Sequence, residues 1–487
     1  MKRLWPVLIL ACALCLGFGF GVPKPETASM QATGPDGLPA IIFVAAPKVV
    51  PGQLTGRFPE GSHLVRYTPG TPASSAVNLT PNFYAVADPQ VSFSATMVLF
   101  AGQKTRRAQW QIWEMKVDGS GLRQITNCSE DCFQPAYLPH GQIAYTAVTG
   151  KGSRQSSAIY VSQLSGTDPH RITFGPGDYH LETVLRSGRL LVSAKPSLAA
   201  VGKDDGSRVF YTLRPDGSGL FLFRWGTQPN YLRTSATELW DGSVLFVKRK
   251  EQAGRLMGGE LAWIQPGALH NSVITRLGSA YWSVHVLDGE NLVVSRRSSE
   301  GSAGAGKFGL YVFHLGNRSA GKEIYTNPKL SSVEPVPIEP SAIPLYFPSM
   351  LHLNWNYGRI VCLNSYLSSE TPNGLLAGHI AKVRVIALGA GDHNERVLGE
   401  AAVENDGSFY IKVPADKPLR FELIGAGGSV IREQKSWVWA GRGEDVACLG
   451  CHESHAIVPQ DRFPQALKNS NTPIAIGLSA STTPHKH

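Results

Sequence analysis

The sequence predicts a mainly β protein, in which a six-bladed β-propeller, or alternatively a seven-bladed one, is followed by a small β-sandwich domain. Three observations support this fold class. A strand-turn-strand unit recurs at a regular period, a second type of hairpin lies between its copies, and helical periodicity is nearly absent. The composition agrees, because 51 glycines and 33 prolines in 487 residues indicate many turns.

The chain begins with a segment of the export type. Lys2 and Arg3 precede an apolar run, residues 4–16, which has signal-peptide length and is too short to span a bilayer comfortably. We therefore expect residues 1–25 to be a signal peptide and the mature protein to be periplasmic, or otherwise exported, in a bacterium. The surroundings of Cys12 loosely resemble a lipoprotein cleavage site, so a lipid anchor at Cys12 is an alternative. No later stretch is expected to span a membrane.

Residues 36–331 are predicted to form the propeller. Copies of the strand-turn-strand unit begin at Leu64, Ile112, Ile159, Val209, Leu261 and Leu310, with spacings of 48, 47, 50, 52 and 49 residues. The hairpins between them, such as Glu238–Val247, place a glycine turn between two strand-forming segments. Two hairpins per period make four strands, which is one propeller blade. The early segment Ile41–Val44 matches the second strand of the later hairpins, and we expect it to close the ring.

A proline-rich stretch, residues 332–351, is predicted to be an extended linker. The segments that follow it resemble short strands separated by glycine, asparagine and proline turns, and they predict a β-sandwich over residues 352–441. In one of these strands Phe409, Ile411 and Val413 alternate with polar or amphipathic residues, which is typical of a half-buried strand.

Residues 442–487 are predicted to form a cofactor loop and a C-terminal tail. They contain Cys448-Leu-Gly-Cys-His452, a C-x-x-C-H pentapeptide. Two thiols at this spacing can each form a thioether with a haem vinyl group, and the adjacent histidine then lies under the iron. A zinc knuckle would need a second ligand pair, and a thioredoxin-type pair should open a helix after a strand. We therefore predict one covalent haem c, with Cys448 and Cys451 as thioether positions and His452 as axial iron ligand.

The other cysteines and the charge pattern suggest structural roles. In an oxidising compartment Cys128 and Cys132 are predicted to form a small disulfide, and Cys362, within an apolar run, is predicted to be a buried core thiol. The formal charge of +9 is spread along the chain without a concentrated basic stripe, so nucleic-acid binding is not predicted. Residues 301–307 have the spacing of a phosphate loop, but a strand follows them, so we expect a hairpin loop.

Several segments together resemble the middle domain of the hydrazine synthase alpha subunit family. They are the stretch Val403–Leu423, the tripeptide Lys435-Ser-Trp437, the dipeptide Gly443-Glu444 and the C-x-x-C-H motif. In that family a propeller precedes a β-sandwich that carries a c-type haem at its C-terminal edge. The resemblance therefore implies the same domain order here, and it implies that Cys448, Cys451 and His452 hold the haem.

This sequence also departs from the family pattern. The family's subunit continues into a further haem-bearing domain, and a tyrosine shortly after the motif contributes to its iron site. Here neither a second C-x-x-C-H nor such a tyrosine follows His452. Hydrazine synthesis itself is therefore not expected of this chain.

The sixth iron ligand separates the functions that the sequence leaves open. A histidine or methionine there would saturate the iron and suit electron transfer, whereas an open position would let a small nitrogen or oxygen species bind and react. The candidates in or near the domain are Met350, His352, His379, His393 and His455. We expect an exported monohaem cytochrome whose propeller docks a redox partner protein, in a hetero-oligomer. A haem-dependent oxidoreductase and a binding scaffold resembling TolB-type periplasmic propellers are the alternatives, and no catalytic residue is predicted.

Overall fold

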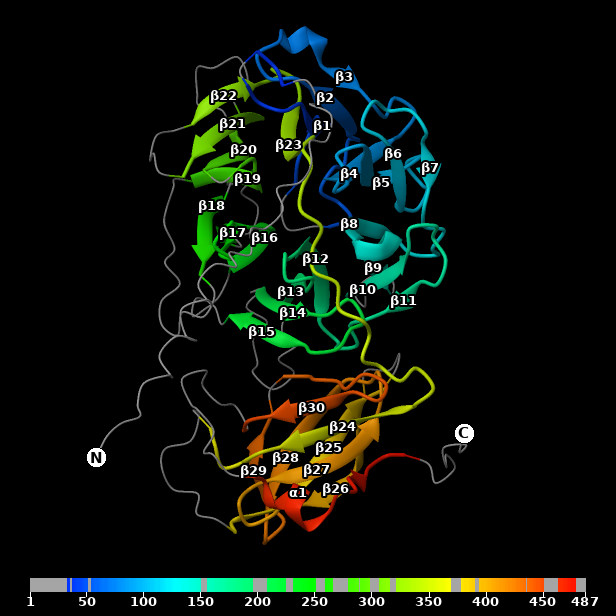
Figure 1. Cartoon of the computed structure of the whole chain (residues 1–487), viewed down its shortest axis with the longest axis vertical. Coiled ribbons are helices and arrows are strands. Elements are labelled where there is room, and N and C mark those ends of the chain that lie inside the picture. The colour runs from blue at the N-terminus through cyan, green and yellow to red at the C-terminus, as the bar shows by residue number, and fades with distance from the viewer. Residues whose placement is uncertain are drawn as a thin grey trace, which may run out of the picture.

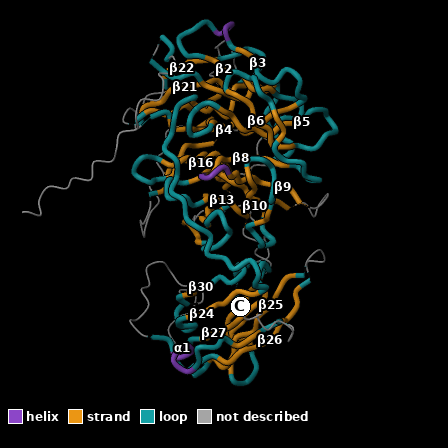
Figure 2. The backbone as a smooth tube through the Cα atoms, turned by 45° about the vertical axis from the view of Figure 1, so that its right-hand side comes forward, coloured by secondary structure: helices purple, strands orange, loops and turns teal. Residues whose placement is uncertain are grey.

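The computed structural model describes two β domains that follow one another along the long axis of the molecule (Figure 1). The described residues are 33–35, 37–50, 54–149, 156–195, 208–224, 231–250, 259–265, 279–288, 290–297, 306–315, 321–368, 378–389, 394–434, 436–450 and 463–478. The predicted signal peptide, including Cys12, lies outside them. Within these ranges helix occurs only in short segments (Figure 2), namely η1 (Ala73–Ser75), η2 (Pro139–Gly141) and α1 (Gln465–Asn469). None of the described helices has the length and apolarity to cross a bilayer.

The first domain is the propeller. Its four-stranded sheets consist of β1 (Ile41–Ala46), β2 (His63–Tyr67), β3 (Val77–Asn78) and β23 (Ser331–Pro337); β4 (Ala85–Val91), β5 (Met97–Gln103), β6 (Gln111–Lys116) and β7 (Arg123–Gln124); β8 (Cys132–Leu138), β9 (Gln142–Thr149), β10 (Ser156–Gln163) and β11 (His170–Arg171); and β12 (Asp178–Val184), β13 (Leu190–Lys195), β14 (Val209–Leu213) and β15 (Phe221–Arg224). A seven-stranded sheet consists of β16 (Tyr231–Glu238), β17 (Val244–Lys250), β18 (Gly259–Ile264), β19 (Ser279–Val286), β20 (Asn291–Arg297), β21 (Phe308–His314) and β22 (Lys322–Tyr325).

Strands from the two ends of the propeller close the ring. β1 pairs antiparallel with β23, from Ile41 opposite Pro337 to Ala46 opposite Ser331. The closure expected from Ile41–Val44 is therefore present, with β23 as its partner. In the seven-stranded sheet only two residue pairs join β18 to β19, so β16–β18 and β19–β22 form separate groups. Counting these groups separately gives six units among the described strands, and the blade number stays a prediction.

Two predicted domain boundaries are wrong. Residues 332–337, predicted as the start of the linker, belong to β23. Pro335 and Pro337 are tolerated there because β23 is the edge strand of its sheet, where one side needs no N–H donors. Residues 463–478, predicted as part of the tail, instead contribute α1 and β31 (Ile474–Ala475) to the second domain.

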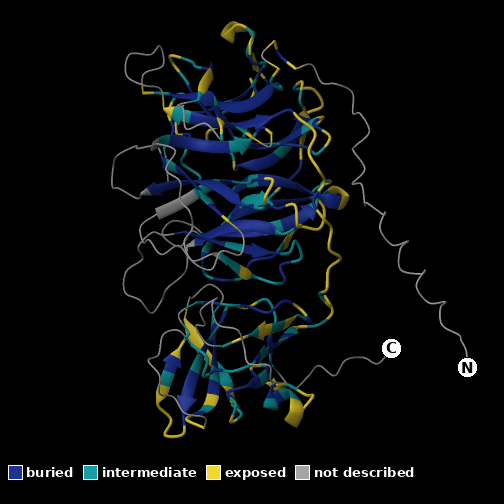
Figure 3. Cartoon of the chain, turned by 60° about the vertical axis from the view of Figure 1, so that its left-hand side comes forward, coloured by how far each residue is buried: buried dark blue, intermediate teal, exposed yellow. Residues whose placement is uncertain are grey.

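The second domain is a sandwich of two four-stranded sheets. One has the order β30 (Asp445–Cys448), β24 (Tyr357–Cys362), β27 (Phe409–Pro414) and β31; the other has the order β26 (Glu395–Ala402), β25 (Ile380–Leu388), β28 (Leu419–Gly425) and β29 (Val430–Glu433). The alternating apolar residues of β27 are buried in the core between the sheets, as the sequence predicts. Cys362 is also buried in this core, as expected. The linker that joins the domains is largely exposed (Figure 3).

The two domains are in contact through side chains near the start of β30. Trp439 of the sandwich domain is 4% exposed and packs edge-on against two propeller rings, with centroid distances of 6.1 Å to Phe174 and 5.9 Å to Tyr179. Glu444 accepts hydrogen bonds from the N–H of Gly219 in the propeller (2.7 Å) and of Gly441 (2.6 Å). The strand that carries Cys448 therefore begins at the domain interface.

Candidate functional site

The structure describes the first part of the C-x-x-C-H motif. Cys448 ends β30, which pairs parallel with β24 so that Cys448 lies opposite Cys362. Along β30 Asp445 and Ala447 are exposed, whereas Val446 and Cys448 are half-buried against the sandwich core. Cys451 and His452 lie outside the described residues, so their roles stay predictions.

The surroundings of Cys448 fit a covalently attached group. β30 is an edge strand, and Cys448 lies half-buried at its end. The next residue, Leu449, is an exposed large apolar side chain of the kind that a haem plane can cover. Gly450 passes so close to Leu367 that a Cβ at position 450 would lie 2.5 Å from the Leu367 carbonyl oxygen. Glycine in the third position of the motif therefore lets the loop follow the sandwich surface.

The candidate sixth ligands are spread over the domain. His352 stacks on Trp355 at 4.6 Å and lies against Gly443, which precedes β30, whereas Cys448 ends that strand. Met350 is exposed, and its sulfur accepts a hydrogen bond from an arginine of the propeller. His379 is exposed beside β25, in the opposite sheet, and the two remaining candidates, His393 and His455, lie outside the described residues. The sixth ligand therefore stays open.

Cys128 and Cys132 are neighbours in the propeller. Both are thiols in the structure, and the Cys132 thiol donates to the Glu130 carbonyl oxygen at 3.9 Å. The neighbouring Cys132 lowers the pKa of Cys128 to about 7, whereas Cys128 and burial raise that of Cys132. The thiols are thus close enough to interact, and the disulfide between them stays a prediction.

The propeller channel contains a second candidate site, which the sequence analysis missed. The inner strand of each unit, β4, β8, β12, β16, β19 or β23, has a β-bulge where its register against the neighbouring strand shifts. Asp88, Gln134, Ser235 and Glu334 lie at four of these bulges, with φ between 50° and 54°. Non-glycine residues rarely adopt this left-handed conformation, and where they do they cluster at binding sites.

Polar side chains at the bulges link each inner strand to the next, and we call them the bulge ring. Its members are Asp88, Gln134, Glu182, Ser235, Ser283 and Glu334, at spacings of 46, 48, 53, 48 and 51 residues. Five of them accept an N–H from the following strand: Glu334 from Asp88 (2.8 Å), Asp88 from Gln134 (2.9 Å), Glu182 from Ala236 (3.4 Å), Ser235 from Val284 (3.1 Å) and Ser283 from Glu334 (2.9 Å). The sixth, Gln134, accepts from the Thr146 hydroxyl, which itself accepts the Leu181 N–H, both at 2.9 Å.

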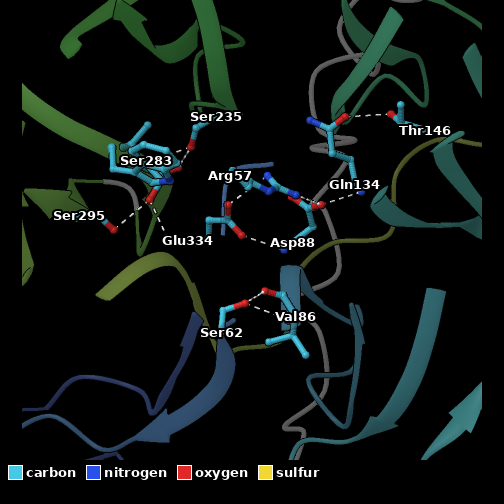
Figure 4. Close-up of polar contacts among 12 residues, drawn as sticks. Arg57, Ser62, Val86, Asp88, Gln134, Thr146, Ser235, Ser283, Ser295 and Glu334 are labelled. Atoms are coloured by element: carbon cyan, nitrogen blue, oxygen red, sulfur yellow. Dashed lines mark hydrogen bonds and ion pairs between the residues drawn. The ribbon is translucent and has the colours of Figure 1, made fainter. Parts of the chain in front are cut away.

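Arg57 lies inside the bulge ring (Figure 4). Its guanidinium forms ion pairs with Asp88 and with Glu334, the latter at 3.1 Å. Burial raises the pKa of Glu334 to about 7, although the charge of Arg57 opposes the shift. Burial likewise raises the pKa of Glu182 to about 7. The channel therefore holds carboxyl groups that titrate near neutral pH.

The bulge ring lines a cavity of about 470 Å³ in the channel. Apolar and aromatic side chains, including Tyr137 and Trp282, form part of its wall, and Arg249 reaches it from β17. Linker residues Ser341 and Pro344 line it as well. A polar residue recurring at the blade period within apolar strands was the signal in the sequence that could have found this site.

Replacing Glu182 by glutamine is expected to stabilise the protein at alkaline pH. Between pH 4.5 and about 7 the folded protein keeps a proton on Glu182 that the unfolded chain has released, so the free energy of unfolding falls as pH rises through this window. The variant should exceed the wild type by about 2 to 3 kcal/mol at pH 8 and differ little at pH 4. Urea unfolding at both pH values measures this difference. Exposed Glu60→Gln is the control, and an equal gain at both pH values would contradict the assignment.

Comparisons with known proteins agree with this architecture. Residues 373–453 match the family model of the hydrazine synthase alpha subunit middle domain. Hydrazine synthase subunit alpha of Kuenenia stuttgartiensis is 22% identical over an alignment 556 residues long, gaps included. The alignment covers 87% of this chain and 67% of that protein. The solved structure of Kuenenia stuttgartiensis hydrazine synthase matches with a TM-score of 0.77 at 19% identity, over 89% of this chain and 72% of that chain. TolB from Acinetobacter baumannii matches with a TM-score of 0.43 at 15% identity, over 61% of this chain and 66% of that chain. The chain thus shares its fold with hydrazine synthase, and its residues 373–453 match the middle domain of the alpha subunit family.

Proposed function

We propose that this protein is an exported monohaem c-type cytochrome that transfers electrons to or from a partner protein. The observation that carries the proposal is a C-x-x-C-H motif at the end of the segment that matches the hydrazine synthase alpha subunit middle domain. Cys448 and Cys451 would form the thioethers, and His452 would be the axial ligand. The haem, when bound, supplies one-electron redox chemistry, while the sandwich holds its attachment strand against the propeller through Glu444.

The exposed linker supports the docking of a partner. The linker and the residues just after it expose large apolar side chains, which we call the linker stripe: Ile343, Leu345, Tyr346, Phe347, Met350 and Leu353. Apolar residues gathered in this way are typical of protein-protein contact surfaces. The relative in Kuenenia stuttgartiensis is named as a subunit, and a hetero-oligomer is part of our proposal for this chain.

A haem enzyme with an open iron position is the second candidate function. The observation that favours it concerns His352, one of the candidate sixth ligands. His352 lies beside Gly443, at the other end of β30 from Cys448. If no side chain occupies the sixth position of the iron, a small nitrogen or oxygen species can bind there.

An optical spectrum of the mature protein, expressed in a host that attaches haem c, tests the proposal. We expect a sharp low-spin α band on reduction with dithionite, unmoved by carbon monoxide, because six-coordinate iron has no vacant position. A high-spin spectrum that shifts with carbon monoxide would favour the enzyme over the electron carrier. Absence of covalent haem would overturn both and leave the propeller as a binding scaffold.

Replacing Cys448 and Cys451 together by serine is expected to abolish covalent haem, because both thioethers are lost. Haem staining after denaturing electrophoresis measures the attached group. The matched control is Cys362→Ala, which removes the thiol paired opposite Cys448 in the sheet and should keep the haem stain. Haem that stays attached to the double variant would contradict the assigned attachment site.

A further inference from the structure

Arg249 is a buried cation in the propeller channel that forms no direct ion pair among the described residues, although the carboxyl groups of Glu182 and Glu334 are near enough to act on its charge. It lies on β17, is 6% exposed, and lines the cavity within the bulge ring. One of its Nη atoms donates to the Trp282 carbonyl oxygen, and its guanidinium carbon lies 4.2 Å from the centre of the Trp282 ring. Its Nε is buried without a hydrogen-bond partner, and across the described part of the chain no carboxylate forms an ion pair with it.

Another of the three arginines that line the cavity, Arg57, shows the contrast. Arg57 has two carboxylate partners, Asp88 and Glu334. Glu182 is likewise engaged, by the Ser193 hydroxyl at 2.6 Å and the Ala236 N–H. The carboxyl groups of the ring are therefore satisfied, which argues against a cationic ligand. Arg249, in contrast, has a buried Nε without a hydrogen-bond partner and no direct ion pair among the described residues.

Unsatisfied groups around the cavity point to a ligand with hydrogen-bond acceptors. The Nε of Arg57, the Nε of Arg249 and the hydroxyl of Thr234 are all buried without a partner, and all three residues line the cavity. A buried guanidinium without an anion is strongly disfavoured, and burial lowers the pKa of Arg249 to about 10. An anion that paired with Arg249 would remove this penalty.

The charge and the shape of the site narrow the class of anion. Because Arg249 lies near the carboxyl groups of Glu182 and Glu334, the site suits a ligand with one negative charge better than a doubly charged phosphate. The planar guanidinium matches the planar carboxylate group in geometry. The cavity volume of about 470 Å³ is within the range of small-molecule sites, and Trp282 and Tyr137 offer apolar surface for an organic body.

We propose that the propeller channel binds a small monocarboxylate, whose carboxylate pairs with Arg249 and whose apolar body lies against Trp282 and Tyr137. The linker passes over one end of the site: Ser341 donates its N–H to Phe93, at 3.0 Å, and both residues line the cavity. In Figure 1 the chain after β23 runs across the face of the propeller past β8 and β12. The inference concerns the propeller and holds whether or not a haem is attached to the sandwich.

Calorimetric titration of the full-length mature protein tests this site. The probes are acetate, benzoate and 3-phenylpropionate, with 3-phenylpropionamide as a neutral ligand of nearly the same shape. We expect 3-phenylpropionate to bind at least about tenfold more tightly than its amide, because only the carboxylate compensates Arg249. Arg249→Gln should weaken the carboxylate by about tenfold or more and leave the amide unchanged. Exposed Arg106→Gln is the matched control and should bind like the wild type.

Thermal unfolding with and without each probe gives a second reading, because a ligand that binds the native state raises the melting temperature. Three results would overturn the proposal: no probe binds to the wild type, the amide binds as tightly as the carboxylate, or folded Arg249→Gln keeps the wild-type affinity. If Arg249→Gln does not fold, the comparison of carboxylate with amide on the wild type decides alone.

Discussion

Replacing Arg57 by methionine is expected to lower the free energy of unfolding by about 3 to 5 kcal/mol at pH 8, because removing one partner leaves buried charges without compensation. Arg57 sits between Asp88 and Glu334 at the point where the first and last segments of the propeller meet. Without it the two carboxyl groups repel one another, and the pKa of Glu334, already raised to about 7 by burial, should rise further. The loss should be smaller at pH 5, where Glu334 is protonated.

Urea unfolding of the variant at pH 5 and pH 8 measures both effects. The control is Arg442→Met, which removes an ion pair between Arg442 and Asp416 whose arginine side chain is 49% exposed. That change should cost less than about 1 kcal/mol. Combining Arg57→Met with Glu334→Gln should recover part of the loss at pH 8. If Arg57→Met costs no more than Arg442→Met, Arg57 does not hold the ring together.

Replacing Trp439 by alanine is expected to cost about 3 to 5 kcal/mol, because a large buried aromatic side chain leaves a cavity behind. Trp439 belongs to the sandwich domain but packs among propeller residues, including Phe174 and Tyr179. The loss should therefore fall on the contact between domains. We expect differential scanning calorimetry to separate the unfolding of the variant into two transitions, or to widen the separation if the wild type already shows two.

The matched control for Trp439 is Trp240→Ala. Trp240 is 71% exposed, so its removal should change stability by less than about 0.5 kcal/mol. Limited proteolysis gives a further measurement, since cleavage within the linker, residues 338–351, should be faster in the Trp439 variant. Equal cleavage rates in the two tryptophan variants would show that Trp439 does not fasten the domains.

The sequence predicted those features of the fold that depend on local chemistry. Glycine turns and alternating strands lie within a few residues of one another, so the repeat of hairpins and the strand Phe409–Pro414 were recognisable without tertiary information. The C-x-x-C-H motif is also local, and it led to Cys448. The same local reasoning placed residues 332–337 in the linker, because prolines usually interrupt strands, whereas an edge strand such as β23 tolerates them.

The bulge ring, the cavity and the interface between domains could be found only in the tertiary structure. The Asp88 N–H donates to Glu334, which lies 246 residues away in the sequence, and the Gly219 N–H donates to Glu444, 225 residues away. Neither hydrogen bond therefore leaves a short-range pattern in the sequence. Each member of the ring is an ordinary polar residue in its own segment. It becomes part of a site because the closure of the ring by β1 and β23 brings the inner strands around one channel, where buried polar groups must find partners in neighbouring blades.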